Sequence, residues 1–224
     1  MEDATGGAID QKMKYFRSGY FNVGGQSLYV SRTGFTNELG FEIYSEGPAT
    51  DHLALWDHLM ACGGPHGLEF SSTYALTIRR IEGGILGNVT DMDTSMTPFE
   101  AGLAPFINMD KGDFIGRDAL VGKDTRSCLF GITCGTETPT AGSVVMKDAV
   151  VVGRITAGVP SPTLGLGVGY VVFKSPGDWV NQKLRMLLLD GSTHEIHIVN
   201  LPFFDREKNI VRGLDQTIPE RPVT

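Results

Sequence analysis

The sequence predicts an α+β protein in which an antiparallel sheet with helices is followed by a small β-barrel or β-sandwich. Three observations predict this class. Alternating runs flank a Gly/Thr/Asn cluster before residue 44, apolar residues recur at helical spacing between 52 and 82, and short β-branched runs follow residue 128. We therefore expect an α+β segment at 1–124, a β-rich domain at 125–205 and an extended tail at 206–224.

The early part of the chain predicts the strands of the first sheet. A strand-like run from 15 to 30 is interrupted by Gly24-Gly25, which predicts a strand, a turn and a strand. Gln26–Ser31 and Gly40–Tyr44 then flank a loop that contains Gly, Thr and Asn, as in a hairpin.

Glu42 is the side chain around which we expect a binding site. Alternation places Phe41 and Ile43 on one face of the strand, and Glu42 and Tyr44 on the other. A carboxylate held beside aromatic rings can accept two parallel hydrogen bonds from adjacent N–H donors on a flat ring. The same spacing also fits an acid that is merely solvated on an exposed hairpin.

Two helices are expected before the β-rich part, and a short one just ahead of it. His52–Ala61 repeats apolar residues at three-and-four spacing and runs into a Gly-Gly-Pro stop. Ser72–Glu82 follows, with Ser71 or Ser72 as its cap. Arg117–Val121 is the expected short helix.

The β-rich part contains short strand-like runs separated by Gly, Pro, Asp and Ser, which is typical of a small barrel or sandwich. These runs are Gly142–Met146, Val150–Ile155, Val168–Val172, Leu184–Leu189 and Ile196–Val199. Gly158–Pro162 is expected to be a rigid loop, because proline fixes its own φ and biases the preceding residue toward extended geometry.

The charge balance argues against a general nucleic-acid-binding protein. The 224 residues include 26 acids and 19 bases, for a net charge of −7, whereas such proteins usually carry a basic face. The sequence has no apolar run of about 18 residues and no charged-then-apolar leader. We therefore expect a soluble chain in the cytoplasm, or in the mitochondrial matrix of a eukaryote.

Cysteines and histidines give no catalytic or metal-binding pattern. Cys62, Cys128 and Cys134 are odd in number and irregularly spaced, which fits reduced thiols rather than a disulfide framework or a zinc site. The five histidines lack metal-ligand spacing and a Ser or Cys partner signature. Nucleophilic catalysis and nucleotide binding are therefore not supported.

Acidic residues around Asp91 and Asp93 do not predict a metal site. The stretch lacks the acid at every second position and the central glycine of a calcium loop, so loop capping is the expected role. Arg79 and Arg80 are adjacent on the second expected helix and point about 100° apart. One of them is expected to bind a carboxylate, and the other to pair with surface acids.

Several segments, in one order along the chain, resemble the glycine cleavage T-protein (aminomethyltransferase) family. They are Ser31–Tyr44 (SRTGFTNELGFEIY), Arg80–Gly84 (RIEGG), Thr97–Leu103 (TPFEAGL), Asp113–Leu120 (DFIGRDAL), and Gly158–Leu164 with Gly169–Val171 (GVPSPTL and GYV). Each segment is weak alone, but their order makes the set specific. The family also includes folate-dependent demethylases, such as dimethylsulfoniopropionate demethylase.

The resemblance implies binding of tetrahydrofolate. The acid in the G-x-E motif of the family grips the pterin, and it maps onto Glu42. Phe35 stands where the family has tyrosine, so it loses a hydroxyl donor and keeps a stacking face. Asp91 and one of Arg79 or Arg80 are expected near the same folate.

Two departures from the family bear on its activity. The arginine of the family's A-R-D-S-L-R-L-E-A-G maps onto Leu76, and this exchange is not conservative at a bidentate anchor. The demethylase branch also lacks that arginine. The family's catalytic aspartate comes from an N-terminal part that has no counterpart in this sequence, so no catalytic residue is named.

Two functions remain open. The first is a tetrahydrofolate-dependent transferase that moves an aminomethyl or methyl unit from a small amine or sulfonium donor, with a lipoyl carrier protein as a candidate partner. The second is a non-catalytic folate-binding or assembly module, or a fragment that needs a separate N-terminal chain. No nucleic-acid or membrane partner is expected.

Overall fold

The computed structural model describes residues 1–10 and 12–217, which fall into two compact units. The first unit contains Met1–Leu76 together with residues 207–217, and the second contains Thr77–Arg206. The expected segment 1–124 therefore spans both units, and the expected domain 125–205 falls within the second. The expected tail is described as far as residue 217, whereas residues 218–224 lie outside the described residues.

The sheet of the first unit has three antiparallel strands, β1 (Ser18–Val23), β2 (Gln26–Ser31) and β3 (Glu42–Tyr44), in that order. Gly24 and Gly25 join β1 to β2 with φ angles of +61° and +85°. A two-residue hairpin turn of type I′ requires such left-handed backbone at both positions, and glycine adopts it without steric cost. The predicted hairpin is confirmed, and β3 begins at Glu42 rather than at Gly40.

One face of this sheet forms the core of the first unit. Val23, Leu28 and Val30 are buried there with Ile9, and partly buried side chains pack against them. These partly buried side chains are Met1, Met13, Phe21, Phe41, Ile43, Leu55 and Leu59. Phe41 and Ile43 therefore share one face, as the alternation predicted, and that face is the core side of the sheet.

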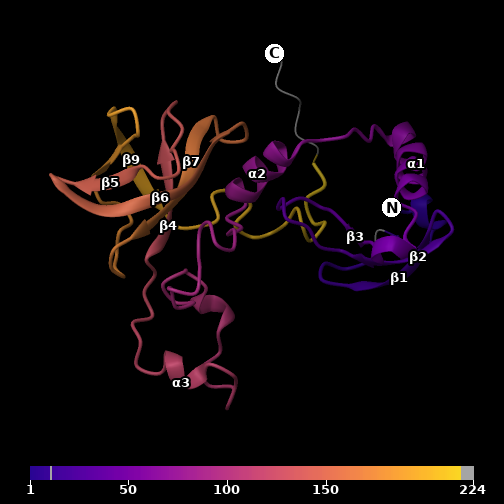
Figure 1. The fold of residues 1–224 in the computed structure, drawn as a ribbon, viewed down its shortest axis with the longest axis horizontal. Helices are drawn as coiled ribbons and strands as arrows, with labels where there is room; N and C mark the ends of the chain where they lie inside the picture. Colours follow the sequence, from indigo (N-terminus) through magenta and orange to yellow (C-terminus); the bar gives the residue numbers. More distant parts are fainter. Residues whose placement is uncertain (11, 218–224) are drawn as a thin grey trace. The chain divides into compact units, whose positions relative to one another are not determined.

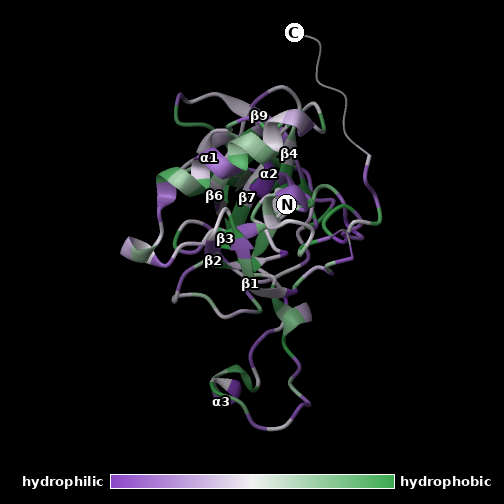
Figure 2. Ribbon diagram, turned by 90° about the vertical axis from the view of Figure 1, so that its right-hand side faces the viewer, coloured by the Kyte–Doolittle hydropathy of each residue, from purple (hydrophilic) through white to green (hydrophobic). Residues whose placement is uncertain are grey.

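The three predicted helices are present as α1 (His52–Gly63), α2 (Thr73–Glu82) and α3 (Arg117–Leu120). Asp51 caps α1, because its carboxylate accepts a hydrogen bond from Ala54 N at 3.0 Å. Hydrophobic and hydrophilic residues are interleaved along α1 (Figure 2). Short 3₁₀ helices lie at Asp3–Thr5, Gly47–Ala49, Gly64–His66 and Ala104–Phe106.

The described part of the expected tail, residues 207–217, belongs to the first unit. It forms hydrogen-bonded turns, such as Gly213 N to Ile210 O at 2.8 Å. Val211 is buried, and Lys208 Nζ donates to Asn37 Oδ1 at 2.7 Å. This segment therefore contributes side chains and main-chain groups to the unit that contains Glu42.

A closed six-stranded antiparallel barrel dominates the second unit (Figure 1). Its strands are β4 (Leu129–Cys134), β5 (Val144–Lys147), β6 (Val150–Ser161), β7 (Leu166–Phe173), β8 (Leu184–Leu187) and β9 (Thr193–Val199). The order around the ring is β4-β7-β6-β5-β8-β9, and pairing of β4 with β9 closes it. The predicted α+β class is confirmed, and the structure selects the barrel over the sandwich.

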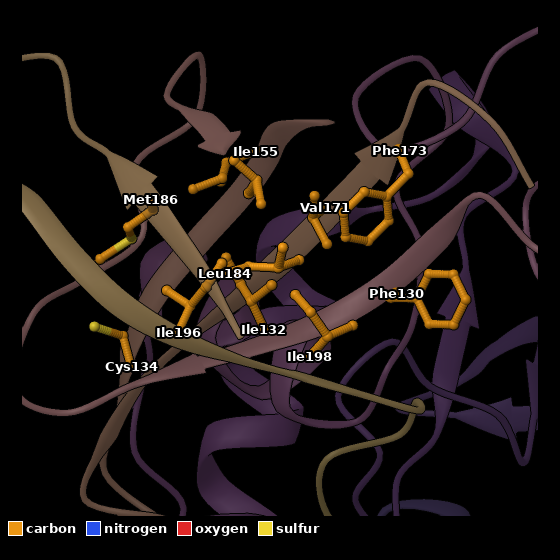
Figure 3. Packing of buried hydrophobic residues seen from close by; sticks show 11 residues of the cluster. Phe130, Ile132, Cys134, Ile155, Val171, Phe173, Leu184, Met186, Ile196 and Ile198 are labelled. Carbon is orange, nitrogen blue, oxygen red and sulfur yellow. The ribbon is translucent and has the colours of Figure 1, made fainter. Parts of the chain in front are cut away.

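Alternate residues of the barrel strands fill its interior (Figure 3). The buried cluster consists of Phe130, Ile132, Cys134, Val145, Ile155, Val171, Phe173, Leu184, Met186, Ile196 and Ile198. Every barrel strand contributes at least one of these side chains. A barrel of this size has room only for its own side chains.

The Gly158–Pro162 segment is not the predicted loop, because β6 continues to Ser161. Pro160 lies opposite Gly167 of β7, whereas β5 pairs only with residues 150–154 of β6. Beyond residue 154, β6 therefore has no β5 neighbour that would need an amide from Pro160. Proline is tolerated in a strand at such an unpaired edge.

Two glycines of the same motif are explained by a close backbone approach. Gly158 and Gly169 are register partners in β6 and β7, and Pro139 lies against both. A Cβ at Gly158 would overlap the carbonyl of Pro139, and a Cβ at Gly169 would overlap the Ala157 carbonyl oxygen and lie 3.1 Å from Pro139 Cβ. Only glycine allows the 137–139 segment to rest on this strand pair.

Among the described residues, no helix combines the length and the apolar character needed to cross a bilayer.

Candidate functional site

Glu42 lies at the start of β3 on the face of the sheet that is opposite to the core. Its register partner on β2 is Ser31. Glu42 Oε2 accepts hydrogen bonds from Thr33 Oγ1 and, at 3.4 Å, from Tyr44 Oη. Within the described part of the chain, Glu42 Oε1 has no protein donor, so this oxygen is available to a ligand.

Three tyrosines form a row across the same face. Tyr20, Tyr29 and Tyr44 are register partners on β1, β2 and β3, and their ring centroids are separated by 5.2 and 5.9 Å. Tyr44 is 49% exposed, and Tyr29 Oη is 2.7 Å from Ser18 Oγ. Alternation along β3 places Tyr44 on the same face as Glu42, whereas the row depends on the register of the hairpin and could not be identified from the sequence.

Tyr15 is a further residue of this region that the sequence analysis did not single out. Burial raises the pKa of its hydroxyl, nearby Arg32 lowers that pKa, and nearby Glu42 raises it. Tyr15 therefore lies within the electrostatic field of both charged residues. Its hydroxyl stays protonated at neutral pH and remains a hydrogen-bond donor.

Phe35 and Asn37 belong to the loop between β2 and β3. Phe35 is 41% exposed, so its ring face is partly accessible to a ligand. Asn37 adopts φ +60°, a left-handed conformation that asparagine tolerates better than most residues other than glycine.

The second unit holds the other predicted site residues, beginning with Arg80 and Asp91. Arg80 Nη1 donates to Asp91 Oδ2 at 2.7 Å, and the Asp91 side chain is fully buried. The same carboxylate accepts from Gly87 N at 2.7 Å and from Thr156 Oγ1 at 2.8 Å. Each Asp91 oxygen therefore has a donor from its own unit, which fits a structural role.

Arg79 pairs with a different acid. Its Nη1 donates to the carboxylate of Glu82, and the Glu82 side chain is only 1% exposed. Ser161 Oγ donates to Glu82 Oε1 at 2.5 Å, and Thr163 Oγ1 donates to Glu82 Oε2 at 3.0 Å. These contacts join both arginines to buried acids, whereas the sequence led us to expect that one of them would pair with surface acids.

The predicted site residues thus form two groups, Glu42 with Phe35 in the first unit, and Arg79, Arg80 and Asp91 in the second.

Asp93 and Glu100 act within loops. Asp93 Oδ1 accepts from Ser95 Oγ at 2.5 Å and from Ser95 N at 2.8 Å, and these bonds lower the pKa of Asp93. Glu100 Oε2 accepts from Thr97 N at 2.7 Å while Glu100 N donates to Thr97 Oγ1 at 3.2 Å. This reciprocal pair has the pattern of a capping box. No group of three or more potential metal-binding side chains occurs within residues 1–10 and 12–217.

Two family models match the chain. The GCVT N-terminal domain matches residues 2–111, and the glycine cleavage T-protein C-terminal barrel domain matches residues 127–205. The second range contains all six strands of the observed barrel.

Curated relatives give the same result. An aminomethyltransferase of Streptomyces avermitilis is 35% identical over 209 residues, which is 88% of this chain and 54% of that protein. One from Caldanaerobacter subterraneus is 31% identical over 187 residues, which is 80% of this chain and 50% of that protein. The chain thus spans about half the length of the curated relatives it matches.

A solved structure, the glycine cleavage system aminomethyltransferase T from Bartonella henselae, matches with a TM-score of 0.76. The match covers 89% of this chain and 55% of that chain, at 23% identity, and it concerns the fold. Together with the two family models, which account for most of the sequence, these likenesses show that the chain belongs to the glycine cleavage T-protein family.

Proposed function

We propose that this chain binds tetrahydrofolate on the outer face of the β1–β2–β3 sheet and takes part in the transfer of a one-carbon unit to it. The observation that carries the proposal is the Glu42 carboxylate, with one oxygen held by Thr33 and Tyr44 and the other without a protein donor in the described chain. A carboxylate fixed in this way can accept hydrogen bonds from a ligand without first losing a strong internal contact.

The residues present fit a pterin. One edge of a pterin presents adjacent N–H donors, and Glu42 Oε1 is an acceptor for such a donor. The aromatic rings of Tyr44 and Phe35 are both more than a third exposed, and each can contact a flat heterocycle through its face or edge. We propose Glu42 as the acceptor and Phe35 and Tyr44 as the ring contacts.

Bound tetrahydrofolate would supply the nitrogen that accepts the one-carbon unit. The contribution of this chain would be to hold and orient the pterin, which lowers the entropic cost of bringing the two reactants together. Of the two arginines in the second unit, Arg79 has the more exposed side chain, at 24% against 10% for Arg80. We therefore propose Arg79, rather than Arg80, as the arginine of the second unit that can meet a carboxylate, with Arg80 and Asp91 shaping its surroundings; this proposal concerns the second unit by itself.

The donor is proposed from the relatives. Curated relatives carry the name aminomethyltransferase, which favours an aminomethyl group presented by a lipoyl carrier protein. A small methylated sulfonium or amine is the alternative donor, and Leu76 in place of the family's arginine favours it.

Calorimetric titration with tetrahydrofolate tests the proposal. We expect Glu42→Gln to weaken binding at least about tenfold, because the hydrogen bonds would lose a charged acceptor. Glu195→Gln is the matched control, since Glu195 is an exposed acid on a strand of the barrel. Equal affinity of Glu42→Gln and the unmodified chain, or no binding by either, would remove the folate assignment.

A further inference from the structure

Arg32 is a buried cation without an acidic partner. The residue is 5% exposed, and no carboxylate of the described chain lies within ion-pair distance of it. Its Nη1 donates to the Val211 carbonyl at 2.9 Å, and its guanidinium lies 5.4 Å from the centre of the Phe41 ring. Two weak contacts of this kind do not neutralise a buried charge, which normally has a paired anion.

The surroundings of Arg32 disfavour its charge further. Burial lowers the pKa of the Arg32 guanidinium, and only Tyr15 acts in the opposite direction. Tyr15 remains a neutral phenol at physiological pH, because burial raises its own pKa. The site would therefore gain stability from an anion that the chain itself does not supply.

Arg32 lines a cavity of about 520 Å³ within the first unit. This volume is in the range that holds a small organic ligand. Leu39 and Phe41 contribute apolar side chains to its wall, and Arg212 contributes a second cation. An apolar wall beside a guanidinium suits a molecule with an apolar body and a planar oxyanion, which a guanidinium binds with two parallel hydrogen bonds.

Acidic residues that line the same cavity narrow the class of ligand. Glu2, Asp10, Glu38 and Asp215 also line the cavity. Hydrogen bonds from Thr217 lower the pKa of Asp215, which keeps its carboxylate ionised. A ligand with several negative charges, such as a phosphate ester, would be repelled by these acids, whereas a ligand with one carboxylate and one ammonium group would be attracted at both ends.

We propose that this cavity is a binding site for an amphoteric small molecule, with its carboxylate on Arg32, its ammonium group toward the acids and its apolar part against Phe41.

This site is separate from the face that carries Glu42. Phe41 points to the core side of β3, and Glu42 follows it on the opposite side. Arg32 follows Ser31, the register partner of Glu42, and approaches Phe41. The inference therefore does not rest on the proposed folate site, and either can fail without the other.

Three small ligands of similar shape, which differ in their charged groups, test the proposal on the full chain. L-Phenylalanine carries both charges, 3-phenylpropanoate lacks the ammonium group, and L-phenylalaninamide lacks the carboxylate. By calorimetry we expect L-phenylalanine to bind most tightly, 3-phenylpropanoate to bind more weakly, and the amide to lose at least about tenfold relative to L-phenylalanine.

Variants assign the effect to Arg32. Arg32→Gln should weaken the binding of L-phenylalanine at least about tenfold and leave the weak binding of L-phenylalaninamide unchanged. Arg126→Gln is the control, because Arg126 is a half-exposed arginine of the second unit whose partner is Asp124. Glu42→Gln should leave L-phenylalanine binding unchanged, which separates this site from the folate proposal.

The proposal is overturned if the amide binds as tightly as L-phenylalanine, if neither carboxylate shows saturable binding, or if Arg32→Gln retains full affinity. Should Arg32→Gln fail to fold, the comparison of acid and amide on the unmodified chain decides.

Discussion

Arg80 and Asp91 form an ion pair, 2.7 Å between Nη1 and Oδ2, in which the carboxylate has no access to solvent. Arg80 also donates to the Ile85 carbonyl at 2.8 Å, so its guanidinium joins the C-terminal end of α2 to the loop that follows. Thr156 Oγ1 connects Asp91 to β6 of the barrel. A single carboxylate thus holds a helix end, a loop and a strand together.

Replacing that carboxylate should therefore be costly. We expect Asp91→Asn to reduce the free energy of unfolding by about 3–5 kcal/mol, because the change leaves the Arg80 charge buried without its partner. Thermal and urea unfolding measure the effect. Asp124→Asn removes an acid from the exposed pair with Arg126 and should leave the unfolding midpoint unchanged. Similar midpoints for the two variants would contradict the structural role of Asp91.

The buried Glu82 carboxylate gives a second prediction. Ser161→Ala removes the 2.5 Å hydrogen bond to Glu82 Oε1, and we expect it to destabilise the second unit by about 1.5–3 kcal/mol. Ser192→Ala removes a comparable bond of 2.7 Å to Asp190 on the exposed surface and should have no measurable effect. Equal effects of the two serine variants would show that burial of Glu82 does not strengthen its contacts.

The left-handed backbone at Asn37 predicts an order of stability. Asn37→Ala should be less stable than Asn37→Gly by about 1–2 kcal/mol, because at φ +60° the alanine Cβ lies too close to the backbone carbonyl oxygen and glycine has no Cβ. Both variants lose the hydrogen bond from Lys208, so the difference in their free energies of unfolding reports the steric cost of the left-handed backbone. Chemical denaturation measures it, and an alanine variant as stable as the glycine variant would contradict the observed loop conformation.

Cys128 predicts a dependence of stability on pH. Burial, with smaller effects from Glu100 and Asp124, raises the pKa of the Cys128 thiol from 9.0 to about 11. Between these values the unfolded chain has lost the thiol proton and the folded chain retains it, so stability falls as pH rises through this window. We expect Cys128→Val to show a shallower fall from pH 9 to 11 in urea titrations. Parallel curves for the two proteins would show that Cys128 does not contribute.

Elements governed by local periodicity could be predicted closely. β2 spans the predicted residues, and α2 begins one residue after the predicted start and ends at Glu82. In both cases a strong alternation or a helical repeat is bounded by turn or capping residues, so the signal lies within the segment itself.

The sequence did not predict β4, because the contacts that favour a strand at these residues come from distant parts of the chain. Leu129–Cys134 contains Gly131, and glycine is depleted in strands. The Phe203 ring packs against this position, where a Cβ at Gly131 would lie 2.8 Å from it. A contact between residues so distant in sequence cannot be recognised from one segment of the chain.

The residues of the candidate site also divide into those that local patterns predict and those that depend on distant contacts. The opposite faces of Phe41 and Glu42 follow from alternation and were predicted. The acids that pair with Arg79 and Arg80 were not, because the contacts of buried Glu82 come from Ser161 and Thr163, which lie 79 and 81 residues further along the chain. The cavity beside Arg32 could not be predicted either. Arg212 lines it and the Val211 carbonyl accepts a hydrogen bond from Arg32, and both residues lie far from Arg32 in sequence.

The order β1-β2-β3 has a consequence for the handling of this protein. β1 and β3 are terminal strands, so within the described residues each has one row of main-chain amides and carbonyls without a strand neighbour, whereas ring closure leaves the barrel with no terminal strand. Ser18–Val23 carries no charged residue that would discourage an incoming strand. Aggregation on concentration or storage should therefore begin at β1, and a lysine introduced at Asn22 would be the first change to make against it.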